Sequence, residues 1–551
     1  MKSRKVLRWG QSSKKDSRQM KNKIATFPIP FTLEEVQGKG KTKKNISIST
    51  NNSLSKQDAI NQAINLHSQG NIKEAIKYYQ YCINQNFNDP IIFSNYAIIL
   101  KELGKLKEAE ILVRKAIDIK PNYAEAHLNL GNILKGLGKF KEAEILVRKA
   151  IQIKPNYAEA HNNLGNILSD LGDLKEAEVS QRKAIKLKSD FAMAHFNLGS
   201  ILRDLGNLKE AEISTRKAIN LKPDFAIAHS NLGTILGDLG NFEEAEISYS
   251  NALSVNPGSS LALMNRAQLF FDQKKFDLAL KDADACNNQN ARAFALEILY
   301  ASGKVDEVYE RIQKTDDVDR NNIRMAAFSS FISEKEKKES SHNFCPQPIS
   351  FLHFTNLKFH LTDYDEFIRE MVKELLNIKT VWNPQNLSTY NGFHTPTSIN
   401  LFSNPPQKIS LLQSIIFKEL NNYYLKFKNE LCSYIQNWPS KQNIFGWHVI
   451  LKKQGYQSAH IHPGGWLSGV IYLKVVPPLE KDEGAIEFSL NGQNYSYKDS
   501  PKLTYQPKLG DIILFPSSLH HRTIPFTTDN DRIVIAFDLM PEGYKSYGIS
   551  Y

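Results

Sequence analysis

The pattern of apolar and polar positions changes character once along this chain of 551 residues. From about Ser55 apolar residues recur with helical spacing, and the whole pattern repeats every 34 residues. The segment AEAHLNLGNILKGLGKFKEAEILVRKAIQIKP (124–155) returns as AEAHNNLGNILSDLGDLKEAEVSQRKAIKLKS (158–189). Beyond Ile444 the pattern gives way to short apolar runs bounded by Gly, Pro, Asp and Asn, which is typical of strands. The sequence therefore predicts an α + β multidomain protein, in which an all-α repeat array precedes a β domain.

Each repeat is expected to fold as two helices joined by a tight turn. Glycine recurs where the two helices would pack closest and again in the turn, alanine recurs in the second helix, and proline ends most units because it stops a helix. These features resemble the tetratricopeptide repeat. The resemblance implies six clear units over about residues 56–259 and two eroded units to about residue 322. It also implies a solenoid with a concave surface that binds a protein or peptide partner.

An asparagine recurs at one place in the first helix of six successive units, and the resemblance implies that this place faces the inner groove. An amide side chain both donates and accepts hydrogen bonds, so the ladder could hold an extended peptide backbone. O-linked N-acetylglucosamine transferases have a similar ladder. Alternatively, the amides bond the adjacent helix. The ladder consists of Asn95, Asn129, Asn163, Asn197, Asn231 and Asn265.

The second half of the chain is expected to be a separate domain. Composition shifts after Glu334, where EKEKKESSHNF has the character of a charged linker. Two helices are expected at roughly 363–376 and 407–433, and the runs GWHVILKK, WLSGVIYLKVV, GAIEFSL, DIILFP and RIVIAFDL are expected as strands of a barrel or jelly roll. The expected divisions are a basic tail (1–54), the repeat array (55–322), a linker (323–344) and the β domain with flanking helices (345–551).

Candidate chemistry gathers in the last hundred residues. His460 and His462 alternate on one segment, His521 follows in FPSSLHHRTIP, and Arg532 lies on the next expected strand. Imidazole suits Fe(II), and an iron held between strands takes its ligands from distant segments. Only one of His520 and His521 can face inward on an alternating strand, and the motif favours His521.

The motifs HIHPGGWLSGVIYL, GAIEF, GDIILFPSSLHHRTIP and RIVIAF resemble 2-oxoglutarate and Fe(II)-dependent oxygenases, which have the double-stranded β-helix fold. The resemblance implies that His460 and His521 bind iron. It also implies that Arg532 binds the far carboxylate of the cosubstrate 2-oxoglutarate through a bidentate fork. Common members carry Asp or Glu where this chain has His462.

Three interpretations of His462 stay open. It could complete an all-histidine iron site. Alternatively, it could lie near an iron that has two protein ligands and water, an arrangement that resembles the site of aspartyl/asparaginyl β-hydroxylases. In the third, the site no longer binds metal. Further pocket candidates are Trp466, Ser468 and Tyr472, with packing as the alternative for the aromatic residues.

Charge and cysteine content bear on nucleic-acid contact and on the redox compartment of the protein. Residues 1–45 carry 13 Lys/Arg against three Asp/Glu, which accounts for +10 of the net charge of +12. Nucleic-acid contact is therefore expected only through this tail, which is expected to be disordered. The four cysteines form no CxxC pair, which favours a reducing, cytoplasmic setting. No apolar run approaches the roughly 20 residues of a membrane-spanning helix.

The favoured function is that of an Fe(II)/2-oxoglutarate-dependent dioxygenase, a hydroxylase acting on a protein or peptide laid along the repeat groove. One alternative is a non-catalytic scaffold for protein–protein interaction. Another is a small-molecule hydroxylase whose repeats serve assembly. The sequence contains no phosphate-binding GxxxxGK[ST] loop and no Gly-x-Ser-x-Gly nucleophile elbow.

Overall fold

The computed structural model describes residues 55–384 and 387–543, which form two compact units divided between Pro223 and Asp224. The basic tail expected at 1–54 lies outside the described residues. Within the described ranges, no helix combines the length and the apolar character needed to cross a membrane. The unit that contains the β domain begins at Asp224, well before the boundary expected near residue 322.

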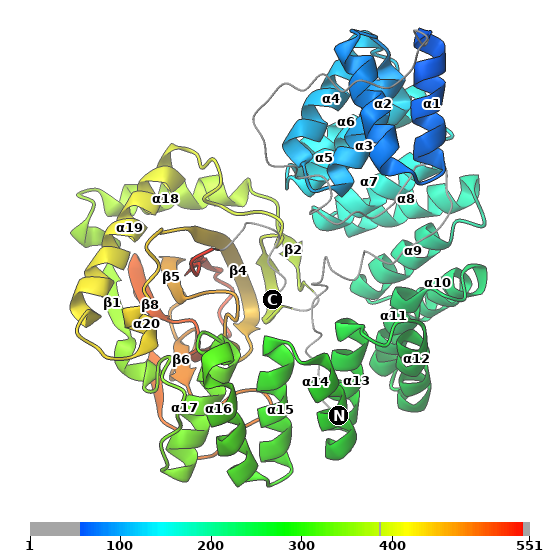
Figure 1. Ribbon diagram of the computed structural model, residues 1–551. Helices are drawn as coiled ribbons and strands as arrows, with labels where there is room; N and C mark the ends of the chain where they lie inside the picture. The colour runs from blue at the N-terminus through cyan, green and yellow to red at the C-terminus, as the bar shows by residue number, and fades with distance from the viewer. Residues whose placement is uncertain (1–54, 385–386, 544–551) are drawn as a thin grey trace. The chain divides into compact units, whose positions relative to one another are not determined.

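Paired helices build the repeat array (Figure 1). The first unit contains α1 (Lys56–Ser68), α2 (Ile72–Asn84), α3 (Pro90–Glu102), α4 (Leu106–Ile119), α5 (Ala124–Gly136), α6 (Phe140–Ile153), α7 (Ala158–Asp170), α8 (Leu174–Leu187), α9 (Ala192–Asp204) and α10 (Leu208–Leu221). The second unit begins with α11 (Ala226–Leu239), α12 (Phe242–Val255), α13 (Ser260–Asp272), α14 (Phe276–Cys286), α15 (Gln289–Ala301) and α16 (Val305–Asp319). Over the residues that the structure describes, the array thus contains eight helix pairs.

Glycine permits the close approach of the two helices within a repeat. A Cβ built on Gly131 would lie 2.5 Å from Cγ2 of Val147, and one on Gly199 would lie 2.2 Å from Oγ1 of Thr215. The turn glycine Gly138 has a φ of +77°, which side-chain-bearing residues rarely adopt. The recurring glycines therefore have the two roles that their spacing predicted.

Most of the expected linker is helical. Helix α17 (Ile323–Glu336) follows the last pair and buries Phe328 in the core of the β domain. On the same helix Arg324 forms a two-point ion pair with Glu297, at 2.6 and 2.9 Å, and Glu297 also accepts from Asn494 Nδ2 at 2.6 Å. The charged run that suggested a linker begins only in the last turn of α17. The apolar residues before it pack α15 and α17 onto the β domain.

In the described part of the chain, ten strands form two antiparallel sheets, with the orders β1-β8-β5-β10-β4-β3-β2 and β7-β6-β9. The strands are β1 (His353–Asn356), β2 (Val381–Trp382), β3 (Thr389–His394), β4 (Ile444–Gln457), β5 (Leu467–Lys474), β6 (Ile486–Ser489), β7 (Lys502–Tyr505), β8 (Asp511–Pro516), β9 (His520–Thr523) and β10 (Arg532–Leu539). The accompanying helices are α18 (Tyr364–Leu376), α19 (Gln407–Phe427) and α20 (Ser433–Gln436), with 3-10 turns η3 (Pro348–Phe351) and η4 (Leu357–Phe359). The double-stranded β-helix, or jelly roll, with flanking helices is thereby confirmed. Helix α19 ends before the expected residue 433, because the polar segment 428–430 offers nothing apolar to bury.

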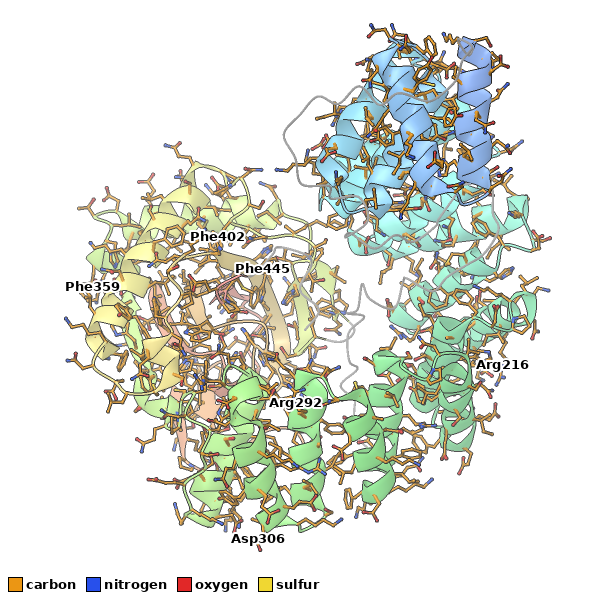
Figure 2. All side chains as sticks on the ribbon, viewed as in Figure 1. Arg216, Arg292, Asp306, Phe359, Phe402 and Phe445 are labelled. Atoms are coloured by element: carbon orange, nitrogen blue, oxygen red, sulfur yellow. The ribbon has the colours of Figure 1, made fainter. Side chains whose placement is uncertain are left out.

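Alternation along β10 separates the two faces of the larger sheet. Ile535 packs in the outer core together with residues of α18 and α19. Phe402, labelled in Figure 2, belongs to this outer core. Its ring lies against Gly446, where an added Cβ would lie 2.2 Å from Cε2 of Phe402. Arg532 and Asp538 have the opposite parity, so they lie on the inner face of the same strand.

Acid is expected to destabilise the β domain through His448. Burial lowers the pKa of His448 to about 4, and its side chain is fully buried. Because the unfolded chain binds the proton first, stability is full above pH 6.5 and is lost as pH falls from 6.5 towards 4. The pKa shift of one such histidine lowers the free energy of unfolding by about 2 kcal/mol between pH 7 and pH 5.

Urea unfolding at both pH values tests this expectation, with tryptophan fluorescence as the readout. The tryptophans in the described ranges lie between residues 382 and 466, so the signal reports the β domain. His448→Asn should reduce the loss of unfolding free energy between pH 7 and pH 5, whereas His229→Asn, at a partly exposed position, should leave it unchanged. An unchanged pH dependence in His448→Asn would contradict the assignment.

Candidate metal centre

Three histidine side chains converge between the two sheets. His460 and His462 lie between β4 and β5, and His521 lies on β9. The backbone N–H groups of His460 and His521 donate to each other's carbonyl oxygens at 3.1 Å, which joins the two segments. One ring nitrogen of each histidine lies within 4.8 Å of those of the other two. Over residues 55–384 and 387–543, this is the one group of three or more His, Cys, Asp or Glu so arranged.

In two of the three rings Nδ1 faces a backbone carbonyl. His460 Nδ1 lies 2.7 Å from the oxygen of Ser458, and His521 Nδ1 lies 3.2 Å from that of Leu519. A carbonyl only accepts, so Nδ1 carries the hydrogen and the lone pair resides on Nε2. The tautomer is the one that a metal ligand bound through Nε2 requires.

The third ring has a carboxylate partner. His462 Nδ1 lies 2.6 Å from Oδ1 of Asp538, which is fully buried. Ser468 Oγ donates to the same oxygen at 2.7 Å and lies 2.8 Å from Ser517 Oγ. Gly465 makes this approach possible, since a Cβ there would lie 2.9 Å from Cγ of Asp538. Position 462 therefore has an imidazole in place of the usual carboxylate, and the carboxylate of Asp538 is the hydrogen-bond acceptor of that imidazole.

Burial keeps two of the candidate ligands, His460 and His521, neutral. It lowers the pKa of His460 to about 3, with a further contribution from nearby His462. The pKa of His521 falls well below its usual value for the same reason, followed by the effects of His460 and His462. A neutral imidazole retains the lone pair that a metal ion needs, so proton competition is weak near neutral pH.

Asp538→Asn is expected to weaken Fe(II) binding by about 10- to 100-fold, the usual cost of losing an outer partner of a metal ligand. Asparagine keeps the shape of the side chain but removes the negative charge behind His462. Anaerobic competition with a metallochromic chelator measures the affinity. The control is Asp511→Asn, which alters another buried carboxylate that accepts from Asn356 and Tyr505. Equal affinities in wild type and Asp538→Asn would contradict the expectation.

The register on β9 separates the two adjacent histidines. His521 joins the cluster, whereas the ring of His520 lies edge-on to Tyr495 with centroids 5.7 Å apart. Burial lowers the pKa of His520 to about 3, with a further contribution from Arg324 of α17. The two side chains thus point to opposite faces, as strand alternation requires.

A buried arginine on β10 has hydrogen-bond donors that lack acceptors in the described part of the chain. Arg532 is 2% exposed, and its Nε and Nη1 have no hydrogen-bond partner in the described part of the chain. Its Cζ lies 4.9 Å from the ring centre of Tyr472, whose hydroxyl also lacks a partner there. Buried donors normally have acceptors, so these orphaned groups indicate an anionic ligand.

The remaining pocket candidates are two residues of β5 and Trp466, which directly precedes that strand. Ser468 and Tyr472 lie on the inner face, where they contact the residues described above. Trp466 does not reach the histidines. Its Nε1 donates to the carbonyl of Tyr434 at 3.0 Å, and its ring packs against Phe344 in the outer core. The position of Trp466 therefore corresponds to the packing alternative.

Two residues near the histidine cluster, His394 and Asp538, were not predicted from the sequence. The ring of His394 on β3 stacks against Trp447 with centroids 6.1 Å apart, and Trp447 lies 5.4 Å from His462. No motif marks the short strand β3. Asp538 could have been found, because it shares the parity of Arg532 on one strand and is a lone carboxylate in an otherwise apolar run.

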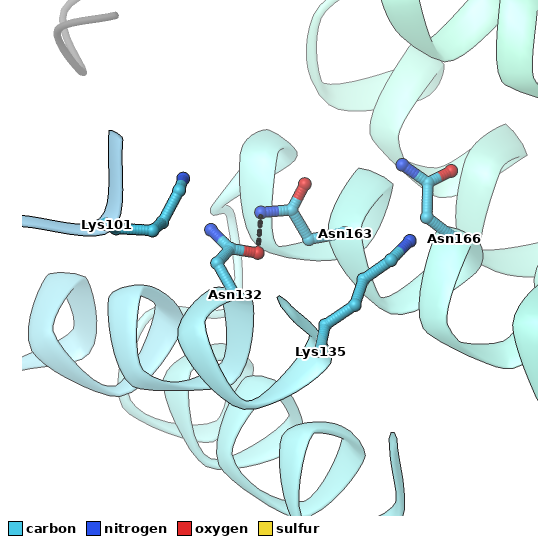
Figure 3. Close-up of a pocket in the computed structure, with 5 residues that line it drawn as sticks. All are labelled: Lys101, Asn132, Lys135, Asn163 and Asn166. Carbon is cyan, nitrogen blue, oxygen red and sulfur yellow. Dashed lines mark hydrogen bonds between the residues drawn. The ribbon is translucent and has the colours of Figure 1, made fainter. Parts of the chain in front are cut away.

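The asparagine ladder bonds neighbouring helices. At four ladder positions the amide nitrogen donates to a side chain of the first helix in the preceding repeat, which is the alternative arrangement. These bonds are Asn129 to Ser94 at 3.0 Å, Asn163 to Asn132 at 2.9 Å (Figure 3), Asn197 to Asn162 at 2.8 Å, and Asn265 to Thr234 at 3.3 Å. Their amide nitrogens therefore tie one repeat to the next.

Family models match two separate parts of the chain. Residues 446–538 match the family described as "Putative 2OG-Fe(II) oxygenase". Tetratricopeptide repeat families match residues 92–123, 124–157, 158–191, 192–225 and 230–286. No curated protein matches the chain.

Several solved structures resemble part of the chain. YrrB, described as a TPR protein with an unusual peptide-binding site, is 26% identical with a TM-score of 0.29, over 34% of this chain and 97% of that chain. The pilF protein of Pseudomonas aeruginosa is 20% identical with a TM-score of 0.33, over 38% of this chain and 97% of that chain. The Cut9–Hcn1 hetero-tetramer of APC/C is 16% identical with a TM-score of 0.39, over 43% of this chain and 48% of that chain.

Proposed function

We propose that this tetratricopeptide repeat protein with a 2OG-Fe(II) oxygenase domain hydroxylates a C–H bond of a protein or peptide that its repeats hold. The observation that carries the proposal is the cluster of His460, His462 and His521, in which every Nδ1 faces an oxygen acceptor. When bound, Fe(II) would supply the oxidation, in which 2-oxoglutarate, O₂ and the substrate C–H bond yield succinate, CO₂ and C–OH.

The residues of the chain have distinct parts in this proposal. His460 and His521 would hold the ion through Nε2, and His462 would be the third ligand, aligned by Asp538. Arg532 would bind the far carboxylate of 2-oxoglutarate. The closed surroundings would exclude water, which strengthens the electrostatic contacts of the pocket.

The repeats supply the reason to expect a polypeptide substrate, since such arrays commonly bind extended peptides. The proposal includes a reducing, cytoplasmic setting. The four cysteines, which are all free, agree with that setting.

Anaerobic titration with Fe(II) and 2-oxoglutarate tests the proposal without knowledge of the substrate. We expect the weak visible charge-transfer band of the chelate, and slow succinate formation once O₂ is admitted. His161→Ala, in the repeats, should behave as wild type. Absence of the band at saturating metal would oppose the proposal and favour the scaffold alternative. If the charge-transfer band and succinate both appear but only small molecules stimulate turnover, the small-molecule hydroxylase with repeats used for assembly would be favoured.

A further inference from the structure

Two cysteine side chains, Cys345 and Cys432, form a thiol pair in the outer core of the β domain. Cys345 follows α17 in the chain, and Cys432 directly precedes α20. Two backbone bonds of 2.8 Å hold the two segments together, from the N–H of Ser433 to the carbonyl of Asn343 and from the N–H of Tyr434 to that of Phe344. Within this frame the thiol of Cys345 donates a hydrogen bond to the sulfur of Cys432. The two sulfur atoms are therefore in direct contact, although 87 positions separate them in the sequence.

The two thiols differ in ionisation and exposure. The hydrogen bond from Cys345 lowers the pKa of Cys432 to about 7, against the opposing effect of burial. Burial raises the pKa of Cys345 well above its usual value, and its bond to Cys432 adds to the rise. Cys432 is 7% exposed and Cys345 only 1%. At neutral pH a substantial fraction of Cys432 is thus a thiolate, whereas Cys345 keeps its proton.

Two buried tyrosine hydroxyls lie near the thiol pair and stay neutral. Tyr434 donates to the hydroxyl of Tyr423 at 3.1 Å, and Tyr423 donates to the carbonyl of Phe351 at 2.8 Å. Burial raises the pKa of Tyr423 well above its usual value, and the charges of both thiolates add to that rise. Among these four side chains, Cys432 is therefore the one that ionises near neutral pH.

We propose that Cys345 and Cys432 are a redox-active dithiol that hydrogen peroxide oxidises reversibly to a disulfide. A thiolate is the nucleophile in such oxidations, and a neighbouring thiol completes the disulfide. The more exposed, more acidic Cys432 is the group that peroxide reaches first. Cys345, in contact with it, is the thiol that resolves the product.

The reaction balances in two steps. The sulfur of Cys432 attacks one peroxide oxygen and the O–O bond breaks, which gives a sulfenic acid. The departing hydroxide takes up the proton that the thiol released and becomes water. The sulfur of Cys345 then attacks the sulfur of Cys432, so that the S–S bond forms as the S–O bond breaks. The second hydroxide takes the proton of Cys345 as another water, and two electrons have passed from the sulfur atoms to peroxide.

The disulfide would join the segment after α17 to α20. Ser330 of α17 donates through Oγ to the carbonyl of Cys345 at 3.1 Å, and the carbonyl of Tyr434 in α20 accepts from Nε1 of Trp466 at 3.0 Å. The bond closes a loop that contains α18 and α19, so it restricts the unfolded chain and stabilises the β domain. A reversible disulfide also agrees with a reducing setting, where such bonds are usually transient.

Peroxide treatment of the full chain tests the proposal. The protein is reduced, freed of reductant and exposed to hydrogen peroxide with a metal chelator, so that iron takes no part. After alkylation of the remaining thiols, a non-reducing tryptic digest should contain residues 339–358 joined to residues 429–441. Dithiothreitol should separate the two peptides. The oxidised protein should unfold at a higher urea concentration than the reduced protein, with tryptophan fluorescence as the readout.

Variants assign the two roles, while the wild-type digest needs no variant. Cys345→Ser should stop at a sulfenic acid of Cys432 that dimedone labels, and Cys432→Ser should give neither the label nor the cross-link. Cys286→Ser removes a partly exposed thiol of α14 and should cross-link as wild type does.

Three results would overturn the proposal. One is the absence of the cross-linked peptide from wild type while peroxide oxidises Cys82 or Cys286. Another is equal dimedone labelling of the remaining thiol in Cys345→Ser and in Cys432→Ser, because the order of attack would then be unsupported. The third is an oxidised protein that unfolds at no higher urea concentration than the reduced one. Because the experiment excludes metal, each of these results leaves the proposed oxygenase activity standing.

Discussion

Replacing His521 with alanine is expected to weaken Fe(II) binding by more than about a hundredfold, beyond the usual cost of losing an outer partner of a ligand. The variant removes one of three converging imidazoles and leaves its neighbours without a closed coordination set. The charge-transfer band of the 2-oxoglutarate chelate should disappear, and succinate formation should fall to background. Anaerobic chelator competition and the visible spectrum measure the two effects separately.

The adjacent histidine provides a matched control. His520→Gln alters a ring that is equally buried but lies against Tyr495 rather than in the cluster. It should retain the band and the metal affinity, even if the protein becomes less stable. The reverse pattern, with loss in His520→Gln and retention in His521→Ala, would show that the register assigned to β9 is wrong.

Arg532→Met is expected to raise the dissociation constant of 2-oxoglutarate on the order of a hundredfold while leaving Fe(II) affinity unchanged. Loss of one partner from a buried, hydrogen-bonded charge pair costs about 2–5 kcal/mol. Titration of 2-oxoglutarate at saturating Fe(II), read through the same visible band, measures the change. Arg522→Met is the control, because Arg522 lies on the surface of β9 and pairs with Glu487 at 2.7 Å.

Stability separates a ligand-binding arginine from a structural one. Arg532 is buried with orphaned donors, and an unpaired buried cation is costly to the folded state. Arg532→Met should therefore keep or raise the unfolding free energy of the protein without ligand, measured by urea unfolding. It should also abolish the stabilisation that 2-oxoglutarate gives wild type in the presence of Fe(II). A large loss of stability without ligand would indicate that Arg532 mainly holds the fold.

Local regularities made much of the fold predictable. The 34-residue period is set by one helix pair at a time, and the alternation of the strands is a property of each strand, so both patterns are visible in the sequence. The family matches confirm the fusion of tetratricopeptide repeats with an oxygenase domain. The prediction of a linker at 323–344 was wrong because it relied on a local signal alone. The charged end of α17 is a local signal, but the burial of Phe328 depends on a β domain that follows later in the chain.

In the candidate site, too, local motifs predicted some features, whereas others depend on segments that are distant in the sequence. The motifs by themselves selected His460, His462, His521 and Arg532, because the chemistry requires those residue types in that order. They did not reveal that Asp538, 76 residues from His462 along the chain, accepts its hydrogen bond. Nor could they show that Nε and Nη1 of Arg532 lack partners among the described residues, since that depends on every neighbouring segment.

The sequence by itself thus determined the repeat array, the jelly roll and the identities of the candidate ligands. Only the tertiary structure decided which side chains meet, which face His520 and Trp466 take, and which way the amides of the repeats point. Periodicity is encoded within single helices and strands, where neighbouring residues suffice to express it. Hydrogen-bond direction and burial arise between segments far apart in the chain, and they exist only once those segments have packed together.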